Sequence, residues 1–159
     1  MLLHKILVIF HLLGAATWIG GHIALVRVIL PAALKKRDPS PVLEFERGYG
    51  KVGMLALLVQ AGTGAWLAGT WLGGWSNILN FSVPSAHLVL VKLVLLAATL
   101  VQAGYAYHRL LPRLNEVSSA TLADADKPLR SFALHARFTT ALAVLMLIVG
   151  ASIRLGGLL

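Results

Sequence analysis

Histidine is the side chain with the most obvious chemistry in this chain of 159 residues, which has six histidines and no cysteine. Ionisable side chains are costly in hydrocarbon, so those found there usually face the interior of a helix bundle and serve a function. Neutral imidazole is a good ligand for haem iron and for copper. We therefore predict a membrane protein that binds haem or a metal ion. Five histidines fall at or within long apolar segments, namely His11, His22, His87, His108 and His135.

The absence of cysteine narrows the chemistry of these sites. It excludes disulfides, thiolate metal sites, iron–sulfur clusters and covalently attached c-type haem. The three methionines, Met1, Met54 and Met146, are isolated from one another along the chain. They do not form the clusters that soft Cu(I) ligands tend to form, which counts against Cu(I) translocation. A b-type haem is therefore the first expectation, with copper as the alternative.

The composition is that of a membrane protein. Hydrophobic residues make up 58% of the chain, and the mean hydropathy is +0.81. About 20 helical residues cross the apolar core of a bilayer, and four segments are long enough. We predict an all-α, integral membrane four-helix bundle in a single domain, residues 1–159. The expected spans are residues 3–30, 52–71, 86–109 and 129–155.

The basic residues predict the orientation of the bundle. Of the 14 lysines and arginines, 11 fall on the side of the two polar connections, approximately residues 34–51 and 112–128. The positive-inside rule then gives an up-down bundle with both termini outside, which is periplasmic for a bacterial inner membrane. All six acids also lie in these connections. We expect no carboxylate within the membrane and no proton relay built on Asp or Glu.

The net charge of +8 has a simple explanation in this setting. The charges cluster next to the membrane spans, where they set topology and contact anionic lipids. We therefore expect lipid contact and no nucleic acid as a partner.

Helical geometry groups the histidines by depth. His11 and His22 are 11 residues apart, which is three turns to within about 20°, so they share a face with Trp18. His11 and His87 fall in an outer layer, with His4 at the edge. An inner layer holds His22, His108 and His135. Two layers of histidines across a bundle are typical of a protein that binds two b-type haems, although which histidines pair stays open.

Each of these positions also has a simpler interpretation. Histidines near the interface, such as His4, His108 and His135, are often solvated, and some layering arises by chance in a four-span bundle. Lys92 lies in the outer half of the third span, where it either snorkels outward or reaches a haem or an anion. Lys92 is about 140° around the helix from His87, so only one of them can face the core. Arg137 could pair with haem propionates or with lipid phosphates.

Other polar and small residues suggest partners. Gln60, Thr63, Thr99, Gln102, Tyr105 and Tyr107 could form a quinone pocket, although such groups more often bond neighbouring helices. Ala61, Ala65 and Gly69 form a small-residue stripe that would allow a homodimer. A redox partner protein is a further expectation for an electron-transfer chain.

The segment HLLGAATWIGGHIAL, residues 11–25, resembles the first helix of the copper-resistance D (CopD) family of inner-membrane proteins. A histidine followed by a Trp-x-Gly-Gly motif carries the resemblance, with Trp18, Gly20 and Gly21 in this sequence. Similarity continues through RGYGKVGMLALLVQAGTGAWLAG, through the third span with Lys92, and through LRSFALHARFTTALAVLMLIVGA. The resemblance implies a copper-binding, copper-transport or copper-resistance protein, with Trp18 beside the metal.

A weaker resemblance is to HemJ-type proteins, which are four-span, haem-binding protoporphyrinogen oxidases. It implies a site formed by His11 and Lys92. The acidic signature of that family in the last span is missing here, where the chain has His135, Ala136 and Arg137.

We therefore favour a b-type cytochrome that transfers electrons, and an oxidoreductase if the chain is an enzyme. The alternatives are a CopD-like copper protein, a HemJ-like oxidase and a structural subunit with incidental histidines. The sequence assigns no catalytic residue.

Overall fold

The computed structural model describes residues 2–83, 85–118 and 125–154, and this part of the chain contains helices and turns but no strand. Four long helical segments are apolar enough to cross a membrane, as the sequence predicts. The chain is therefore a multi-pass membrane protein. The elements are α1 (Leu2–Ala24), η1 (Leu25–Ile29), α2 (Leu30–Lys36), α3 (Ser40–Leu72), η2 (Trp75–Asn77), α4 (Ala86–Tyr105), η3 (Ala106–Leu110), α5 (Leu111–Ser118) and α6 (Asp126–Arg154).

Two helical segments continue past the predicted ends of their spans, residues 30 and 109, and each runs through a proline. Pro31 follows η1 and Pro112 follows η3, and both η1 and η3 are π-helical. Proline lacks an N–H and clashes with the carbonyl four residues earlier, and a π-turn relieves this by changing the hydrogen-bond register. The first segment therefore runs without a break to Lys36, and the third runs into α5.

The first connection is much shorter than the sequence analysis predicted. Only residues 37–39 separate α2 from α3, so the prediction of a polar loop over residues 34–51 is wrong. Arg37 adopts the left-handed conformation (φ 54°), and the Asp38 N–H donates to the Ala33 carbonyl at 3.1 Å, which ends α2. The Asp38 carboxylate accepts a hydrogen bond from the Ser40 N–H at 2.9 Å. The Ser40 hydroxyl and N–H lower the pKa of Asp38.

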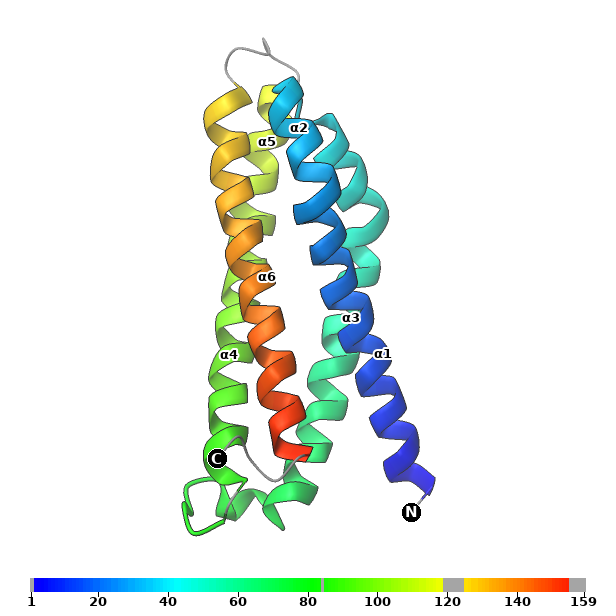
Figure 1. Ribbon diagram of the computed structural model, residues 1–159, viewed down its shortest axis with the longest axis vertical. Coiled ribbons are helices and arrows are strands. Elements are labelled where there is room, and N and C mark those ends of the chain that lie inside the picture. Colours follow the sequence, from blue (N-terminus) through cyan, green and yellow to red (C-terminus); the bar gives the residue numbers. More distant parts are fainter. Residues whose placement is uncertain (1, 84, 119–124, 155–159) are drawn as a thin grey trace.

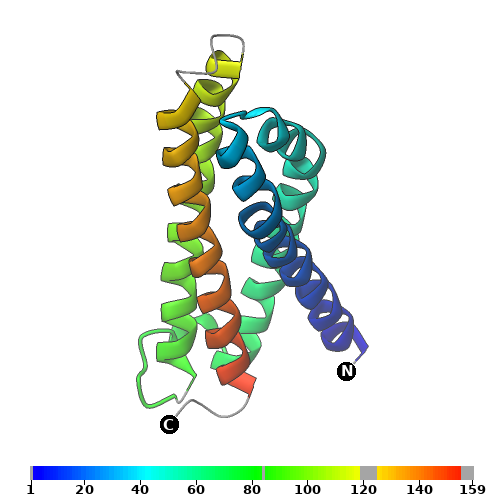
Figure 2. The ribbon, with the colours of Figure 1, turned by 45° about the horizontal axis from the view of Figure 1, so that its top comes forward.

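The helices form two pairs, which Figure 1 shows as α1 beside α3 and α4 beside α6. The start of α1 and the end of α6 lie at the same end of the bundle, which we call the terminal end. We call the opposite end, where α2 and α5 lie, the distal end. Figure 2 shows the first turns of α1 pointing away from α4 and α6 at the terminal end.

Packing differs sharply between the two ends. The distal end contains one cluster of eleven buried residues, centred on fully buried leucines such as Leu30, Leu114 and Leu129. Toward the terminal end the described residues form only two clusters of three. Trp18, Leu57 and Ala143 make the first, and Leu72, Ala86 and Val89 make the second. The two helix pairs are therefore held together mainly at the distal end.

Candidate functional site

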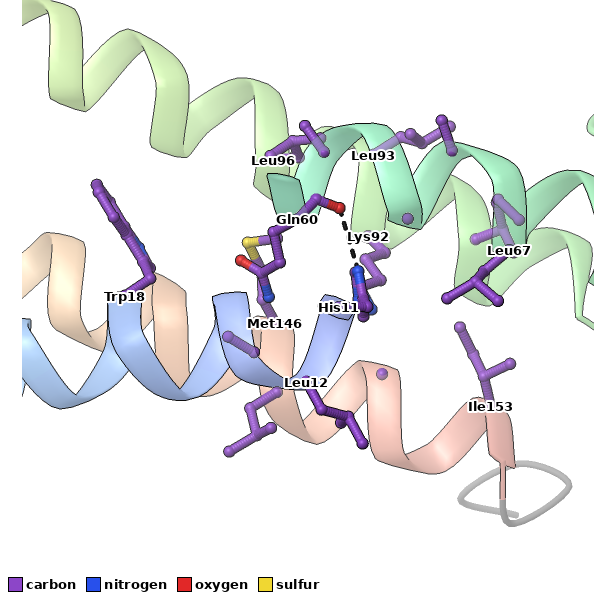
Figure 3. Close-up of a pocket in the computed structure, with 18 of the residues that line it drawn as sticks. His11, Leu12, Trp18, Gln60, Leu67, Lys92, Leu93, Leu96, Met146 and Ile153 are labelled. Atoms are coloured by element: carbon purple, nitrogen blue, oxygen red, sulfur yellow. Dashed lines mark hydrogen bonds between the residues drawn. The ribbon is translucent and has the colours of Figure 1, made fainter. Parts of the chain in front are cut away.

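A cavity of about 310 Å³, which we call the terminal chamber, lies between the helix pairs in the terminal half (Figure 3). Helices α1, α3, α4 and α6 all contribute to its wall. Ala61 and Ala65 of the small-residue stripe line it, and their small side chains leave room for the cavity. Gly69 of the same stripe instead faces the Trp75 indole.

His11 lies in this chamber and is held by α3. Its Nδ1 is 3.1 Å from the Gln60 carbonyl and 3.0 Å from the Thr63 hydroxyl. The Thr63 hydroxyl donates to the Val59 carbonyl at 2.6 Å, so its oxygen can accept the Nδ1–H of His11. These bonds fix the tautomer of His11 and leave Nε2 on the other side of the ring, while the ring Cε1 lies 3.0 Å from the position of a Cβ built on Gly64. His11 is therefore a positioned imidazole at the wall of an apolar cavity.

Lys92 also faces the chamber and does not snorkel outward. Its side chain lies between α4 and α6, where the Nζ is 2.7 Å from the position of a Cβ built on Gly150 (Figure 3). The missing side chain at Gly150 makes room for the ammonium group. His87, which lies about 140° around α4, is exposed and outside the chamber. The structure thus places Lys92 at the bundle interior and His87 at its periphery.

Trp18 separates the terminal chamber from a second cavity. Its indole is 7% exposed and belongs to the walls of both cavities. Among the described residues, its Nε1 is the buried side-chain nitrogen that has no hydrogen-bond partner. The indole ring also lies 4.3 Å from the His22 ring, measured between centroids.

The second cavity, which we call the distal cavity, has a volume of about 1020 Å³ and opens toward the surface. His22 from α1 and His135 from α6 both line it, and so does Glu46 from α3. Glu46 is half-buried, whereas its neighbours Arg47 and Lys51 on the same wall are exposed. This cavity therefore combines two imidazoles from different helix pairs with one carboxylate.

The two histidines of the distal cavity are oriented by their surroundings. Nδ1 of His22 donates to the Trp18 carbonyl at 3.0 Å, which directs Nε2 away from the helix backbone. The ring of His135 lies 5.7 Å from that of Tyr105, measured between centroids. A histidine whose second nitrogen donates to a carbonyl has the arrangement that most metal-binding histidines show.

The remaining predicted site residues lie elsewhere. His4, His87, His108 and Arg137 are exposed and line neither cavity, and His108 packs edge-on against Tyr107 at 5.1 Å. No group of three or more His, Cys, Asp or Glu residues lies close enough to hold a metal ion, within the part of the chain that the structure describes. His11 and His87, which the sequence analysis placed in one layer, therefore do not share a cavity.

Sequence reasoning missed Glu46 and Gly150. Glu46 was placed in a loop, whereas the structure has it on α3, which already begins at Ser40, and on the wall of the distal cavity. A helical phase shared by Glu46, Tyr49 and Gly53, with steps of three and four residues, was the available signal. No sequence signal pointed to Gly150, because its role depends on a lysine 58 positions earlier in the chain.

Comparison with known proteins gives one match. Residues 43–153, more than half of the chain, match the family model described as copper resistance protein D (CopD). This range covers α3 to α6 and starts after α1, so it does not include the run from His11 to Leu25. No curated protein and no solved structure matches the chain.

Proposed function

The chain belongs to the copper resistance protein D (CopD) family, and on this premise we propose that it handles copper as cargo and contacts the ion in the distal cavity. The observation that carries the proposal is that His22 and His135 line one cavity from opposite helix pairs. Imidazole is a suitable ligand for copper in either oxidation state. The proposal extends the family assignment to particular residues.

The donor set favours a transient contact over a storage site. Two imidazoles and the Glu46 carboxylate share the cavity wall, but they are not gathered within bonding distance of one point in the described structure. A site with few preformed ligands binds an ion less tightly than a closed one, and a carrier must release its cargo. The cavity also opens toward the surface, which gives the ion a way in.

Electrostatics favour the distal cavity over the terminal chamber. His11 shares its chamber with the Lys92 ammonium, and no residue lining that chamber is acidic. A positive charge in an apolar cavity repels a second cation strongly, because the surroundings screen it poorly. The distal cavity has the half-buried Glu46 on its wall, and its two basic lining residues, Arg47 and Lys51, are exposed, so that solvent screens their charges. By the positive-inside rule it would face the cytoplasm, so copper would be exchanged there with that compartment.

The test is copper binding by the purified full-length protein in a non-ionic detergent. We expect His22→Ala and His135→Ala each to lower the copper affinity about tenfold or more, a loss at least as large as that from removing an outer-shell partner. Equilibrium dialysis with elemental analysis measures the bound copper. The matched controls are His87→Ala and His108→Ala, which remove exposed imidazoles outside both cavities and should leave the affinity unchanged.

Three results would count against this assignment. Equal copper binding by wild type and by both cavity variants would remove the two histidines from the site. If the exposed-histidine controls lost as much copper affinity as the cavity variants, any imidazole of the protein would contribute to copper binding. Loss in His11→Ala with no change in His22→Ala would move the cargo site to the terminal chamber.

A b-type haem is the second candidate, and the size of the distal cavity favours it. Two imidazoles on facing helices beside a cavity of about 1020 Å³ have the chemistry of a bis-histidine haem site. Under this alternative the chain would transfer electrons. An absorption spectrum of the same purified samples distinguishes the candidates. A Soret band that disappears in His22→Ala and His135→Ala supports haem, and a spectrum without one, with copper bound, supports the copper assignment.

A further inference from the structure

The Lys92 ammonium in the terminal chamber is a cation without a counter-ion. It makes no hydrogen bond or ion pair to any of the described residues. None of the described residues that line the chamber is acidic. The acidic side chains among the described residues lie between residues 38 and 126, in segments near the distal end, so the described part of the terminal half has none. None of the described residues supplies an anion that neutralises this charge within the chamber, which leaves it available to an anionic ligand.

The position of Lys92 is built into the packing of α4 against α6. A lysine two turns from the start of a membrane helix would ordinarily extend toward the interface. Here the ammonium group lies against Gly150, at a place where any other residue would put a Cβ 2.7 Å from Nζ. The charge is therefore held among apolar walls, where an anion gains most from pairing with it.

The rest of the wall suits an alkyl chain. Leu93, Leu96, Leu147 and Ile153 line the chamber around Lys92, as Figure 3 shows for three of them. A small hydrated anion would lose its hydration shell against these side chains without gaining hydrogen bonds from them. An alkyl chain instead buries their apolar surface. The volume of about 310 Å³ lies at the low end for ligand pockets, which favours one chain over the two chains of a phospholipid.

The arrangement of the helices around the chamber favours entry from the lipid phase. Helices α3 and α4 touch at few points, although they are consecutive, and the first turns of α1 diverge from α4 and α6 (Figures 1 and 2). An amphiphile in the outer part of the bilayer meets the chamber sideways, with its headgroup at the depth of the first turns of α4. No part of the wall needs to open into water for such a ligand.

We propose that the terminal chamber binds a single-chain amphiphile with an anionic headgroup, which pairs with Lys92 while the tail lies along α4 and α6. The ligand class is a long-chain carboxylate. The site is separate from the copper site, because Trp18 lies between the two cavities. It also does not depend on the identity of the cargo in the distal cavity.

The experiment measures binding of laurate to the full-length protein in a non-ionic detergent, by native mass spectrometry and by titration calorimetry. We expect Lys92→Met to lower laurate affinity about tenfold or more, as for loss of one charge-assisted hydrogen bond. Lys92→Arg keeps the charge and should retain most of the affinity. Dodecanol, with the same chain and no charge, should bind weakly to wild type and equally to Lys92→Met.

The matched control is Lys5→Met, which removes an exposed lysine from the same end of the bundle. It should bind laurate as wild type does, and Lys92→Met should still bind copper. Equal laurate affinity in wild type and Lys92→Met would overturn the proposal, as would equal affinity of wild type for laurate and dodecanol. Phospholipid retained by wild type and lost from Lys92→Met would overturn the single-chain assignment.

Discussion

The distal and terminal halves of this bundle differ in both packing and charge. The distal half joins the two helix pairs through eleven buried apolar residues and contains the acidic segments of the chain. In the terminal half the pairs diverge around a chamber in which Lys92 is the one charged residue among the described lining residues. Stability is therefore concentrated at one end. The other end is free to keep a cavity and a charge that a close-packed core would exclude.

The largest expected difference between the halves is the loss of unfolding free energy when a leucine is replaced by alanine. Leu129→Ala removes a fully buried side chain from the distal cluster and should lower the free energy of unfolding by about 2–5 kcal/mol. Leu93→Ala only enlarges a chamber that already exists, so its cost should stay below about 2 kcal/mol. Unfolding of both variants in mixed detergent–denaturant micelles measures the difference. Equal costs would contradict the unequal packing.

A second comparison concerns glycines at the two ends. A Cβ at Gly21 would overlap the ring of Tyr49, whose hydroxyl donates to the Thr17 carbonyl and whose ring stacks on Phe45 at 5.0 Å. Gly21→Ala should therefore destabilise the protein by about 1–3 kcal/mol. Gly150→Ala meets only the flexible end of Lys92 and should cost less than about 1 kcal/mol. Thermal unfolding of the two variants ranks them.

The control for this pair is Gly20→Ala, because nothing lies within 4 Å of a Cβ at that position. It should be neutral or slightly stabilising, since alanine favours the helix over glycine. A destabilisation as large as that of Gly21→Ala would show that the effect comes from the α1 backbone and not from Tyr49.

The smallest expected effect is a pH dependence at the distal end. The pKa of Asp38 is lowered by the Ser40 hydroxyl and N–H, so its folded value lies below its unfolded value. The charged form therefore stabilises the turn above about pH 4, and this contribution is lost as the pH falls through the folded pKa. The side chain is largely solvated, so the contribution should be only a few tenths of a kcal/mol.

Asp38→Asn provides the measurement. The amide keeps an oxygen that can accept the Ser40 N–H, but it does not titrate. We expect the difference in unfolding free energy between wild type and Asp38→Asn to be larger at pH 6 than at pH 3. A difference that stays constant, or that grows in acid, would contradict the assignment.

The sequence was sufficient to predict the four spans and the all-α fold, because apolar length alone decides which segments cross a bilayer. Their ends were less predictable. The first and third spans were expected to end at residues 30 and 109, but a π-turn before Pro31 and another before Pro112 let each helix continue. The charged residues after Lys36 resembled a loop in composition, although most of them lie on α3.

The candidate site shows the same limit at the level of side chains. Depth along a helix placed His11 and His22 in different layers, and the structure has them in different cavities. Depth did not reveal that His87 and His108 are exposed. Whether a side chain points into the bundle depends on how its helix is rotated against the neighbouring helices. The sequence allowed the Lys92 side chain to point either outward to the interface or into the bundle. It points into the bundle because Gly150 has no side chain there.

The three-residue turn between α2 and α3 has a consequence for how the molecule is made. Residues 2–72 form one helical hairpin and residues 86–154 contain the second helix pair, so each pair is a continuous stretch of the chain. During synthesis the first hairpin has all of its partners before α4 is translated. Assembly of the bundle is then the docking of two finished hairpins, and the distal cluster is the surface along which they meet.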